Sequence, residues 1–254
     1  MKNLLRLLAI SILSVCCVSA YAVPIDPFNS RPVFVGASDD GASENLQPKF
    51  NSLGLPFNVN TDQNPTGMWS LGGPFPSSIP VVLFEVAGFA ASSQVGIWSD
   101  LNGDSDSPGR TLVDIFLGAA TAGTRASLAY DLTTNLLTTT QSSGPAGAVN
   151  VGTFSGIDIN SFGFYIQPQG GSDTFYSVDQ LNNGAPQMLA FRDPGPNRWT
   201  IAFEDKPYSS SDKDFNDFVF QIESIIPVPE PVSMLLFGTG LLGIGEFIRR
   251  RSKK

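Results

Sequence analysis

The sequence contains no histidine, and this absence excludes several classes of enzyme. Histidine is the commonest general base in catalysis and the commonest ligand of transition metals. Without it, the chain can build neither a serine–histidine–aspartate triad nor a histidine-ligated zinc site. Glycoside hydrolysis by two carboxylates stays open, because it needs only two acids at a suitable separation.

Cysteine is nearly absent too, and both cysteines lie where a mature protein would lose them. Cys16 and Cys17 fall within the first 22 residues. Once that stretch is removed, the protein has neither a thiol nor a disulfide, which excludes cysteine nucleophiles and thiol redox chemistry. The roughly 200 residues that remain are enough to bury a core without disulfides, so we expect a single domain over residues 23–226.

The first 22 residues have the pattern of a secretory signal peptide. A positively charged start precedes an apolar run over residues 7–15, and Ala20-Tyr21-Ala22 supplies the small residues that signal peptidase requires. We predict cleavage after Ala22 and therefore export. An uncleaved N-terminal membrane helix is the alternative, and the shortness of the apolar run argues against it.

Basic residues are scarce in the body of the chain. Residues 23–231 hold 8 Lys and Arg against 22 Asp and Glu, a formal net charge of −14, compared with −8 for the whole sequence. Such a surface repels nucleic acids and anionic lipids and attracts divalent cations. We therefore expect no nucleic-acid partner.

Helical periodicity is also missing, since no stretch of residues 23–226 keeps it for three turns. Apolar residues instead alternate over short stretches between turn-forming residues, the pattern of strands that bury one face. We predict an all-β fold, an antiparallel β-sandwich with about nine to twelve strands. The clearest strands are expected at residues 81–90, 111–118, 161–166, 199–203 and 218–222.

Phenylalanine dominates the aromatic residues, with 19 Phe against 5 Tyr and 3 Trp. Phenylalanine favours protein cores, whereas tyrosine and tryptophan have a polar edge and suit sugar-binding platforms. Trp69 lies in a turn-rich stretch and is therefore the candidate for an exposed platform.

Four oxygen-bearing side chains alternate in one short stretch, namely Asp100, Asn102, Asp104 and Asp106. A tight loop can turn all four toward one Ca²⁺ ion, which accepts about six to eight oxygen ligands. The stretch resembles the start of an EF-hand loop, but Ser105 replaces the glycine and Thr111 stands at the position of the bidentate glutamate. The alternative is an exposed turn in which these side chains cap their own backbone.

A second acidic cluster brackets the loop between the last two predicted strands. Carboxylates that end one strand and begin the next would meet at one edge of the sheet, where they repel unless a cation or hydrogen bonds neutralise them. A solvated loop, partly neutralised by Lys206 and Lys213, is the alternative to a metal site. We predict a calcium site formed by Glu204, Asp205, Asp212, Asp214, Asn216 and Asp217.

A two-carboxylate glycosidase that acts on matrix polysaccharide is the enzymatic alternative. Glu85, Asp114 and Glu204 lie in or beside predicted strands, so a catalytic pair is conceivable. Glu85 also fits an outward position on its strand. We assign no catalytic residue.

The C-terminus combines three elements in a fixed order, with an apolar, glycine-rich run over residues 232–245 in the middle. The flanking residues are Pro229, Glu230 and Pro231 before the run and Arg249, Arg250 and Arg251 after it. Residues 227–254 thereby resemble the PEP-CTERM sorting signal of Gram-negative bacteria. The resemblance implies recognition by an exosortase, a membrane cysteine protease, with removal of the tail. Many such proteins are associated with extracellular polysaccharide or biofilm matrix.

Residues 232–248 would cross the inner membrane once, with the basic end in the cytoplasm. These 17 residues span about 25 Å, which is short for a stable anchor in a hydrocarbon core of about 30 Å. The two prolines hold the preceding stretch extended, as a protease substrate must be. We expect transient membrane passage followed by a cell-surface or extracellular location.

Residues 81–223 are similar, in order, to the DUF4114 domain, and the most specific stretch is WTIAFEDKPYSSSDKDFNDFVFQIE. The family has no assigned activity, but the resemblance implies that the second acidic cluster is a family feature and favours a calcium-stabilised sandwich. The leading hypothesis is an exported, non-catalytic protein with a binding or structural role, with extracellular polysaccharide as a candidate partner. The third hypothesis is that the protein is a structural subunit of the matrix.

Overall fold

The computed structural model describes residues 28–72, 76–86, 93–100, 110–118, 120–142, 148–168 and 173–228. In these residues the helices are α2 (Leu46–Ser52) and the 3-10 helix η3 (Asp179–Asn182). The strands are β1 (Gln63–Asn64), β2 (Trp69–Leu71), β3 (Ser77–Ser78), β4 (Val81–Phe84), β5 (Gln94–Asp100), β6 (Arg110–Phe116), β7 (Arg125–Asp131), β8 (Leu136–Ser142), β9 (Ala148–Phe154), β10 (Gly163–Gln167), β11 (Phe175–Tyr176), β12 (Met188–Arg192), β13 (Trp199–Phe203), β14 (Phe218–Ile222) and β15 (Ile225–Pro227).

Every strand pair among these residues is antiparallel, so the prediction of an all-β antiparallel fold is confirmed. The fifteen strands exceed the predicted number because β1, β2, β3, β11 and β15 have only two or three residues. Strands this short show no alternation in sequence. β13 and β14 begin and end at the predicted residues.

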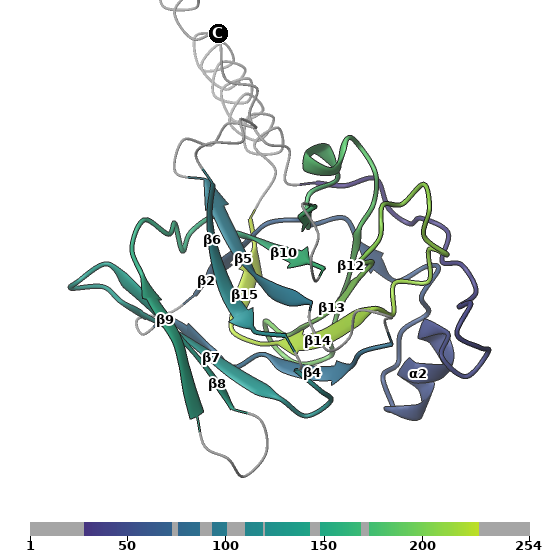
Figure 1. Ribbon diagram of the computed structural model, residues 1–254, viewed down its shortest axis with the longest axis horizontal. Coiled ribbons are helices and arrows are strands. Elements are labelled where there is room, and N and C mark those ends of the chain that lie inside the picture. The colour runs from purple at the N-terminus through teal and green to yellow at the C-terminus, as the bar shows by residue number, and fades with distance from the viewer. Residues whose placement is uncertain are drawn as a thin grey trace, which may run out of the picture.

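The larger sheet has nine strands in the order β1-β12-β13-β14-β4-β7-β8-β9, with β3 paired to β7. The smaller sheet, β11-β10-β5-β6, packs face to face on the inner side of the larger sheet (Figure 1). Phe116 of β6 and Phe164 of β10 contact Phe220 of β14, with ring centroids 5.9 and 5.3 Å apart. Such aromatic pairs add about 0.5–1.5 kcal/mol each beyond the area they bury. This core holds β14 in place.

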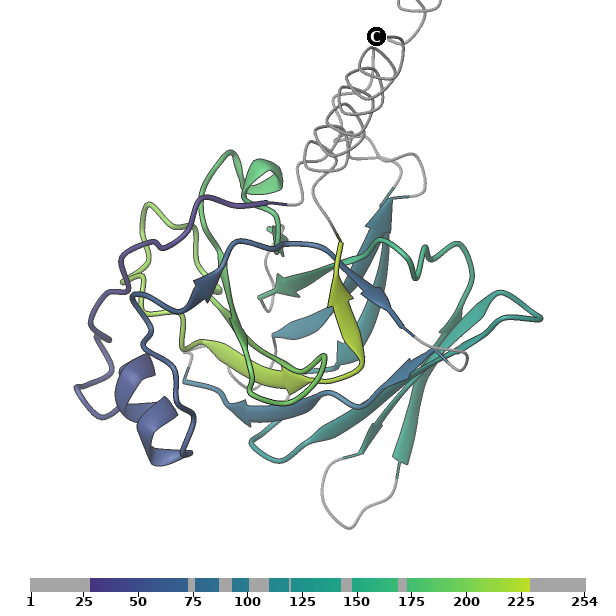
Figure 2. The same cartoon turned by 180° about the vertical axis from the view of Figure 1, so that it is seen from behind.

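At β12, β13, β14 and β4, the outer face of the larger sheet is covered by α2 and the N-terminal segment, which lie beside it in Figures 1 and 2. Leu46 and Phe50 are four residues apart, so both point from one side of α2 toward the sheet. The Phe50 ring lies 5.2 Å from that of Phe191 in β12. β13 is therefore buried along its whole length, and the expectation that it buries one face is wrong.

The sequence of α2 sets both of its ends. Pro48 lies in the first turn, where a missing N–H costs no hydrogen bond. Gly54 has φ +69°, and the N–H groups of Gly54 and Leu55 donate to the carbonyls of Asn51 and Phe50 over 3.1 and 2.9 Å. This Schellman motif satisfies two carbonyls at the helix end and turns the chain away.

Trp69 is fully buried, so the expectation that it forms an exposed platform is wrong. Trp69 begins β2, which pairs with β15, and its ring centroid lies 4.9 Å from that of Phe164. Pairing between these two short strands, far apart in sequence, draws the turn-rich stretch into the core.

No helix within the described ranges is long and apolar enough to span a bilayer. The predicted membrane segment at residues 232–248 lies outside those ranges. The same holds for the predicted processing residues Ala20, Ala22, Pro229, Glu230, Pro231, Arg249, Arg250 and Arg251.

Candidate metal centre

The second acidic cluster lies at the ends of two neighbouring inner strands of the larger sheet, where β13 ends and β14 begins. Glu204 and Asp205 directly follow β13, and residues 212–217 directly precede β14. Because Phe203 pairs with Phe218, the end of one strand lies beside the start of the next. The structure thus brings together the acidic side chains of both segments.

Three carboxylates form the centre of the cluster. Oxygen atoms of Glu204, Asp212 and Asp214 all lie within 4.8 Å of one another. Glu204 and Asp214 are buried and Asp212 is half-buried. Glu204 Oε1 accepts a hydrogen bond from the backbone N–H of Phe215 over 2.7 Å, but Oε2 is buried and accepts none from the described residues. Three acids this close need a neutralising partner.

Asn216 braces the cluster against the N-terminal segment. Its backbone N–H and its side-chain amide both donate to the carboxylate of Asp214. The same amide donates to the carbonyl of Glu44 over 2.8 Å and to Ser38 Oγ over 3.2 Å. Asn216 is buried, and its hydrogen bonds position Asp214. A metal-ligand role for Asn216 itself stays a prediction.

The N-terminal segment also holds Asp212. The backbone N–H of Asp39 donates to Asp212 Oδ2 over 3.1 Å, and that of Gly36 donates to the carbonyl of Lys213 over 2.7 Å. A Cβ atom on Gly36 would lie 2.0 Å from the carbonyl oxygen of Asp212. Glycine is therefore required at position 36 for the two segments to approach this closely.

The backbone between the acids has an unusual conformation. Lys213 and Phe215 have φ values of 66° and 54°, in the left-handed region that non-glycine residues seldom occupy. These two residues alternate with Asp212, Asp214 and Asn216, so the segment winds tightly around the carboxylates. The buried Phe215 ring packs in the outer core and holds this strained conformation in place.

A further group of acids adjoins the three carboxylates. Asp217 Oδ2 accepts a hydrogen bond from the backbone N–H of Asp205 over 2.7 Å. Both carboxylate oxygens of Asp205 and one oxygen of Glu85 are buried and accept no hydrogen bond from the described residues. Glu85 follows β4, which pairs with β14, and this pairing brings it to the same end of these strands.

Burial raises the pKa of every acid in this region for which a shift is resolved. The pKa of Glu204 is raised to about 7 and that of Asp214 to about 6, both mainly by burial. Burial and the charge of Asp205 raise the pKa of Glu85 to about 8, and burial with the charges of Asp205 and Glu204 raises that of Asp217 to about 9. The ionised cluster is thus unfavourable without a bound cation.

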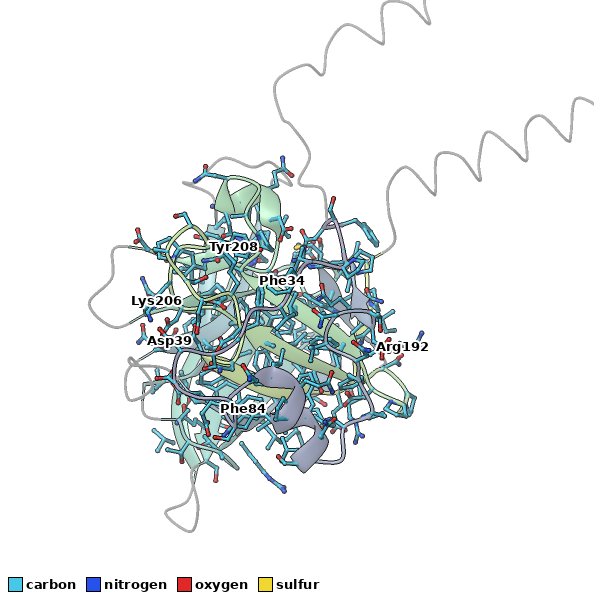
Figure 3. All side chains as sticks on the ribbon, turned by 90° about the vertical axis from the view of Figure 1, so that its right-hand side faces the viewer. Phe34, Asp39, Phe84, Arg192, Lys206 and Tyr208 are labelled. Carbon is cyan, nitrogen blue, oxygen red and sulfur yellow. The ribbon has the colours of Figure 1, made fainter. Side chains whose placement is uncertain are left out.

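The two lysines of the loop do not pair with these acids. Neither Lys206 nor Lys213 forms an ion pair within the described part of the chain. Burial lowers the pKa of Lys206, but attraction to Asp217, Asp205 and other acids outweighs it, and the pKa is raised. Figure 3 shows the exposed Lys206 near Asp39 on this face. Lys213 Nζ lies 4.7 Å from the centre of the Tyr208 ring instead.

Of the first acidic stretch, the structure describes only Asp100. This residue ends β5, is 8% exposed and lies opposite Arg110 of β6 in the strand register. The other predicted ligands, Asn102, Asp104 and Asp106, lie outside the described residues. Calcium binding by this stretch stays a prediction.

The sequence did not single out Glu85 or Gly36 for the second cluster. The sequence left two positions open for Glu85, in a catalytic pair or outward on its strand, and in the structure one of its oxygens is buried. Its place in the site depends on the pairing of β4 with β14, which joins residues far apart in the chain. Gly36 carries no local signal, because its role arises only where the N-terminal segment crosses residues 212–213.

Two family models match the chain. Residues 152–225 match DUF4114, a domain of unknown function, and residues 227–252 match the PEP-CTERM protein-sorting motif. The DUF4114 match is shorter than the predicted span but contains the whole second acidic cluster. The sorting motif marks an exported protein that an exosortase recognises and that is sorted to the cell surface. Neither the curated proteins nor the solved structures include a match.

Proposed function

We propose that this exported protein has a calcium-stabilised β-sandwich body and a non-catalytic binding or structural role at the cell surface or in the extracellular matrix. The observation that carries the calcium assignment is a set of buried carboxylate oxygens, on Glu204 and Asp205, that accept no hydrogen bond from the part of the chain that the structure describes. A buried charge without a partner costs several kcal/mol, so it is found where a cation or a proton neutralises it.

The chemistry of the cluster favours Ca²⁺ among the common cations. Its side-chain donors are all oxygens, which suit hard cations rather than zinc or copper. The strained segment around Asp212 and Asp214 supplies an irregular set of ligands, and Ca²⁺ tolerates such geometry better than Mg²⁺. Water and backbone carbonyls would complete the coordination shell. We expect a dissociation constant of about 10⁻⁴–10⁻³ M, as in extracellular calcium modules.

A bound cation would join three parts of the fold. Glu204 directly follows β13, residues 212–217 lead into β14, and Ser38 and Asp39 hold that segment from the N-terminal side. Calcium would therefore stabilise the packing of the N-terminal segment on the larger sheet. In this proposal calcium has a structural role, and the protein binds its partner at another part of its surface.

Isothermal titration of the full chain, purified in detergent, with CaCl₂ tests the metal site. Glu204→Gln and Asp214→Asn remove one negative charge each, so we expect binding at least about tenfold weaker in either variant. Glu223→Gln is the matched control, because Glu223 is exposed beyond the opposite end of β14. Absence of binding at millimolar Ca²⁺, together with an unchanged melting temperature in EDTA, would reject the site.

A catalytic role receives less support from the geometry. The oxygens of Glu204, Asp212 and Asp214 lie within 4.8 Å of one another. In glycosidases the two catalytic carboxyl groups face each other across the sugar, about 5–5.5 Å apart in retaining enzymes and farther in inverting ones. A panel of labelled glycans incubated with the protein tests this alternative. Cleavage that is lost in Glu204→Gln would establish an enzyme and overturn the non-catalytic role.

A further inference from the structure

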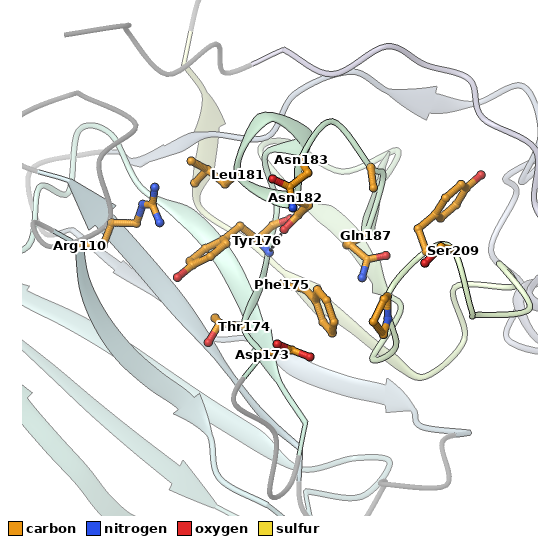
Figure 4. A pocket seen from close by; sticks show the side chains of 13 residues that line it. Arg110, Asp173, Thr174, Phe175, Tyr176, Leu181, Asn182, Asn183, Gln187 and Ser209 are labelled. Carbon is orange, nitrogen blue, oxygen red and sulfur yellow. Dashed lines mark hydrogen bonds between the residues drawn. The ribbon is translucent and has the colours of Figure 1, made fainter. Parts of the chain in front are cut away.

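We propose that an open pocket beside the acidic cluster binds a sugar residue of a neutral polysaccharide. The pocket has a volume of about 780 Å³, within the size range of small-molecule sites (Figure 4). Its walls come from β11, the end of η3 and residues 207–209. The proposal gives a ligand class to the binding role proposed above, and its residues are distinct from the metal ligands.

The aromatic walls of the pocket are the first reason for this assignment. Phe175, Tyr176 and Tyr208 line it and are only half-buried, whereas the largest aromatic side chains of the core are fully buried. The ring of Tyr176 is held by an edge contact with Trp98 at 5.7 Å and by the guanidinium of Arg110 at 5.0 Å. Arg110 covers one face of the Tyr176 ring and Lys213 lies over the Tyr208 ring, so the C–H face of a sugar would pack on Phe175 and on the ring surfaces that these cations leave exposed.

An unused hydrogen-bond acceptor at the pocket is the second reason. Gln187 lines the pocket, is 1% exposed and donates from Nε2 to the carbonyl of Lys206 over 2.8 Å. Its Oε1 accepts no hydrogen bond from the described residues. Figure 4 shows its side chain between Phe175 and Ser209. A buried acceptor whose orientation is fixed is suited to a ligand hydroxyl group, which would satisfy it.

Neutral polar groups occur at the same pocket. Asn182 accepts a hydrogen bond from the backbone N–H of Tyr176 and donates to its carbonyl, over 2.9 and 2.7 Å, and thereby fixes that wall. Asn183 and Ser209 are exposed at the pocket and can exchange hydrogen bonds with sugar hydroxyls. Hydroxyl-rich ligands match this combination of apolar faces and uncharged donors and acceptors.

The charge of the body selects for a neutral ligand. Residues 23–231 carry a formal net charge of −14, so an anionic polysaccharide would be repelled as it approaches. One basic side chain, Arg110, lines the pocket, but its guanidinium is stacked on Tyr176 and it shares the pocket with Asp173. The local balance therefore gives no net attraction for anions.

A glycan array probed with the full chain in detergent, in buffer with Ca²⁺, tests the proposal. We expect binding to neutral oligosaccharides and a dissociation constant at least about tenfold higher for Tyr208→Ala and Phe175→Ala, because each loses a stacking face. Tyr208→Phe keeps the ring and should retain binding. Phe34→Ala is the control, since Phe34 is 74% exposed and does not line this pocket.

Melting temperatures of all variants separate a lost binding site from a lost fold. Binding to acidic glycans alone, binding that both alanine variants retain, or no binding to any glycan would each overturn the proposal. Calcium titration of the same preparations keeps the two proposals apart. A chain that binds Ca²⁺ but no glycan overturns the sugar site alone, and neutral-glycan binding in EDTA supports the sugar site whatever the fate of the metal site.

Discussion

At the residue scale, the acidic cluster is defined by carboxyl groups whose ionised forms are poorly compensated. Glu204 and Asp217 are almost completely buried, and their pKa values are raised to about 7 and 9. Without a cation, each of these carboxyl groups is at least partly protonated at neutral pH. A bound Ca²⁺ would take the place of those protons, so proton and metal compete for the same oxygens.

This competition predicts an unusual dependence of stability on pH. In the unfolded chain these acids ionise near pH 4, so between about pH 5 and 9 the folded, metal-free protein binds more protons than the unfolded chain. Stability must then fall as pH rises through this range. Saturating Ca²⁺ should abolish the fall. Melting curves in EDTA and in Ca²⁺ at several pH values measure both effects, and stability in EDTA that stays flat or rises with pH would contradict the prediction.

Gly36 provides a second prediction at this scale. A methyl group in Gly36→Ala would meet the carbonyl oxygen of Asp212 at 2.0 Å, so the two segments must separate. We expect a loss of about 1–3 kcal/mol in the free energy of unfolding and weaker Ca²⁺ binding, since Asp212 moves. Gly195→Ala is the control, because the nearest atom to its new methyl group is 3.6 Å away. Equal stability of the two variants in urea titrations would refute the role of Gly36.

At the scale of elements, α2 and the N-terminal segment complete the site from outside the larger sheet. α2 buries Leu46 and Phe50 against that sheet, and the residues just before it hold Asp212 and Asn216. Two strands alone would leave the acidic segment exposed on one side. The buried state of the carboxylates therefore depends on a layer that is contributed by the start of the body.

Phe50→Ala tests how strongly this layer is attached. The Phe50 ring contacts Phe57, Phe84 and Phe191 with centroids 5.6, 6.3 and 5.2 Å away. Removing it leaves a cavity in the outer core and should cost about 3–5 kcal/mol of unfolding free energy in urea titrations. Leu53→Ala, at a residue 48% exposed, should cost far less. A Phe50→Ala cost below about 1 kcal/mol would mean that α2 is not firmly packed.

At the scale of the whole molecule, the sorting motif and the acidic body have separate roles: the motif directs sorting, and the body carries the negative charge. The PEP-CTERM match covers residues 227–252 and begins at Pro227, the last residue of β15, so processing near Glu230 and Pro231 would release the strands intact. It would also remove the basic end of the chain. What remains would carry the full negative charge of the body into an exterior that contains Ca²⁺.

Mass spectrometry of the exported protein from its native cell tests whether the C-terminal tail is removed. We expect the C-terminus to lie near Glu230 and Pro231, because an exosortase recognises the motif that contains them. A chain that still ends at Lys254 would show a retained tail and contradict processing. Replacing Arg249, Arg250 and Arg251 with glutamine should leave the tail uncleaved, whereas Lys253→Gln serves as a control for loss of a single charge.

Much of the fold could be predicted from local patterns. The alternating large apolar residues of Trp199–Phe203 and Phe218–Ile222 face the inner core as predicted, although the other face of β13 is buried too. Trp69 could not be placed, because its burial depends on the pairing of β2 with β15. For the same reason the sequence left the orientation of Glu85 open. Pairing between distant segments leaves little trace in the local pattern of a single sequence.

By itself, the sequence determined the all-β class, the position of both acidic segments next to their strands, and the order of the sorting elements, because each depends on residues that are close in the chain. The tertiary structure alone decided which carboxylates share one centre, that Glu85 lies close enough to Asp205 for its pKa to be raised, and that Gly36 must lack a side chain. It also decided that Phe175, Tyr176 and Tyr208 share a pocket. These features arise where segments distant in sequence exclude water together, and burial then sets the charges that the site can hold.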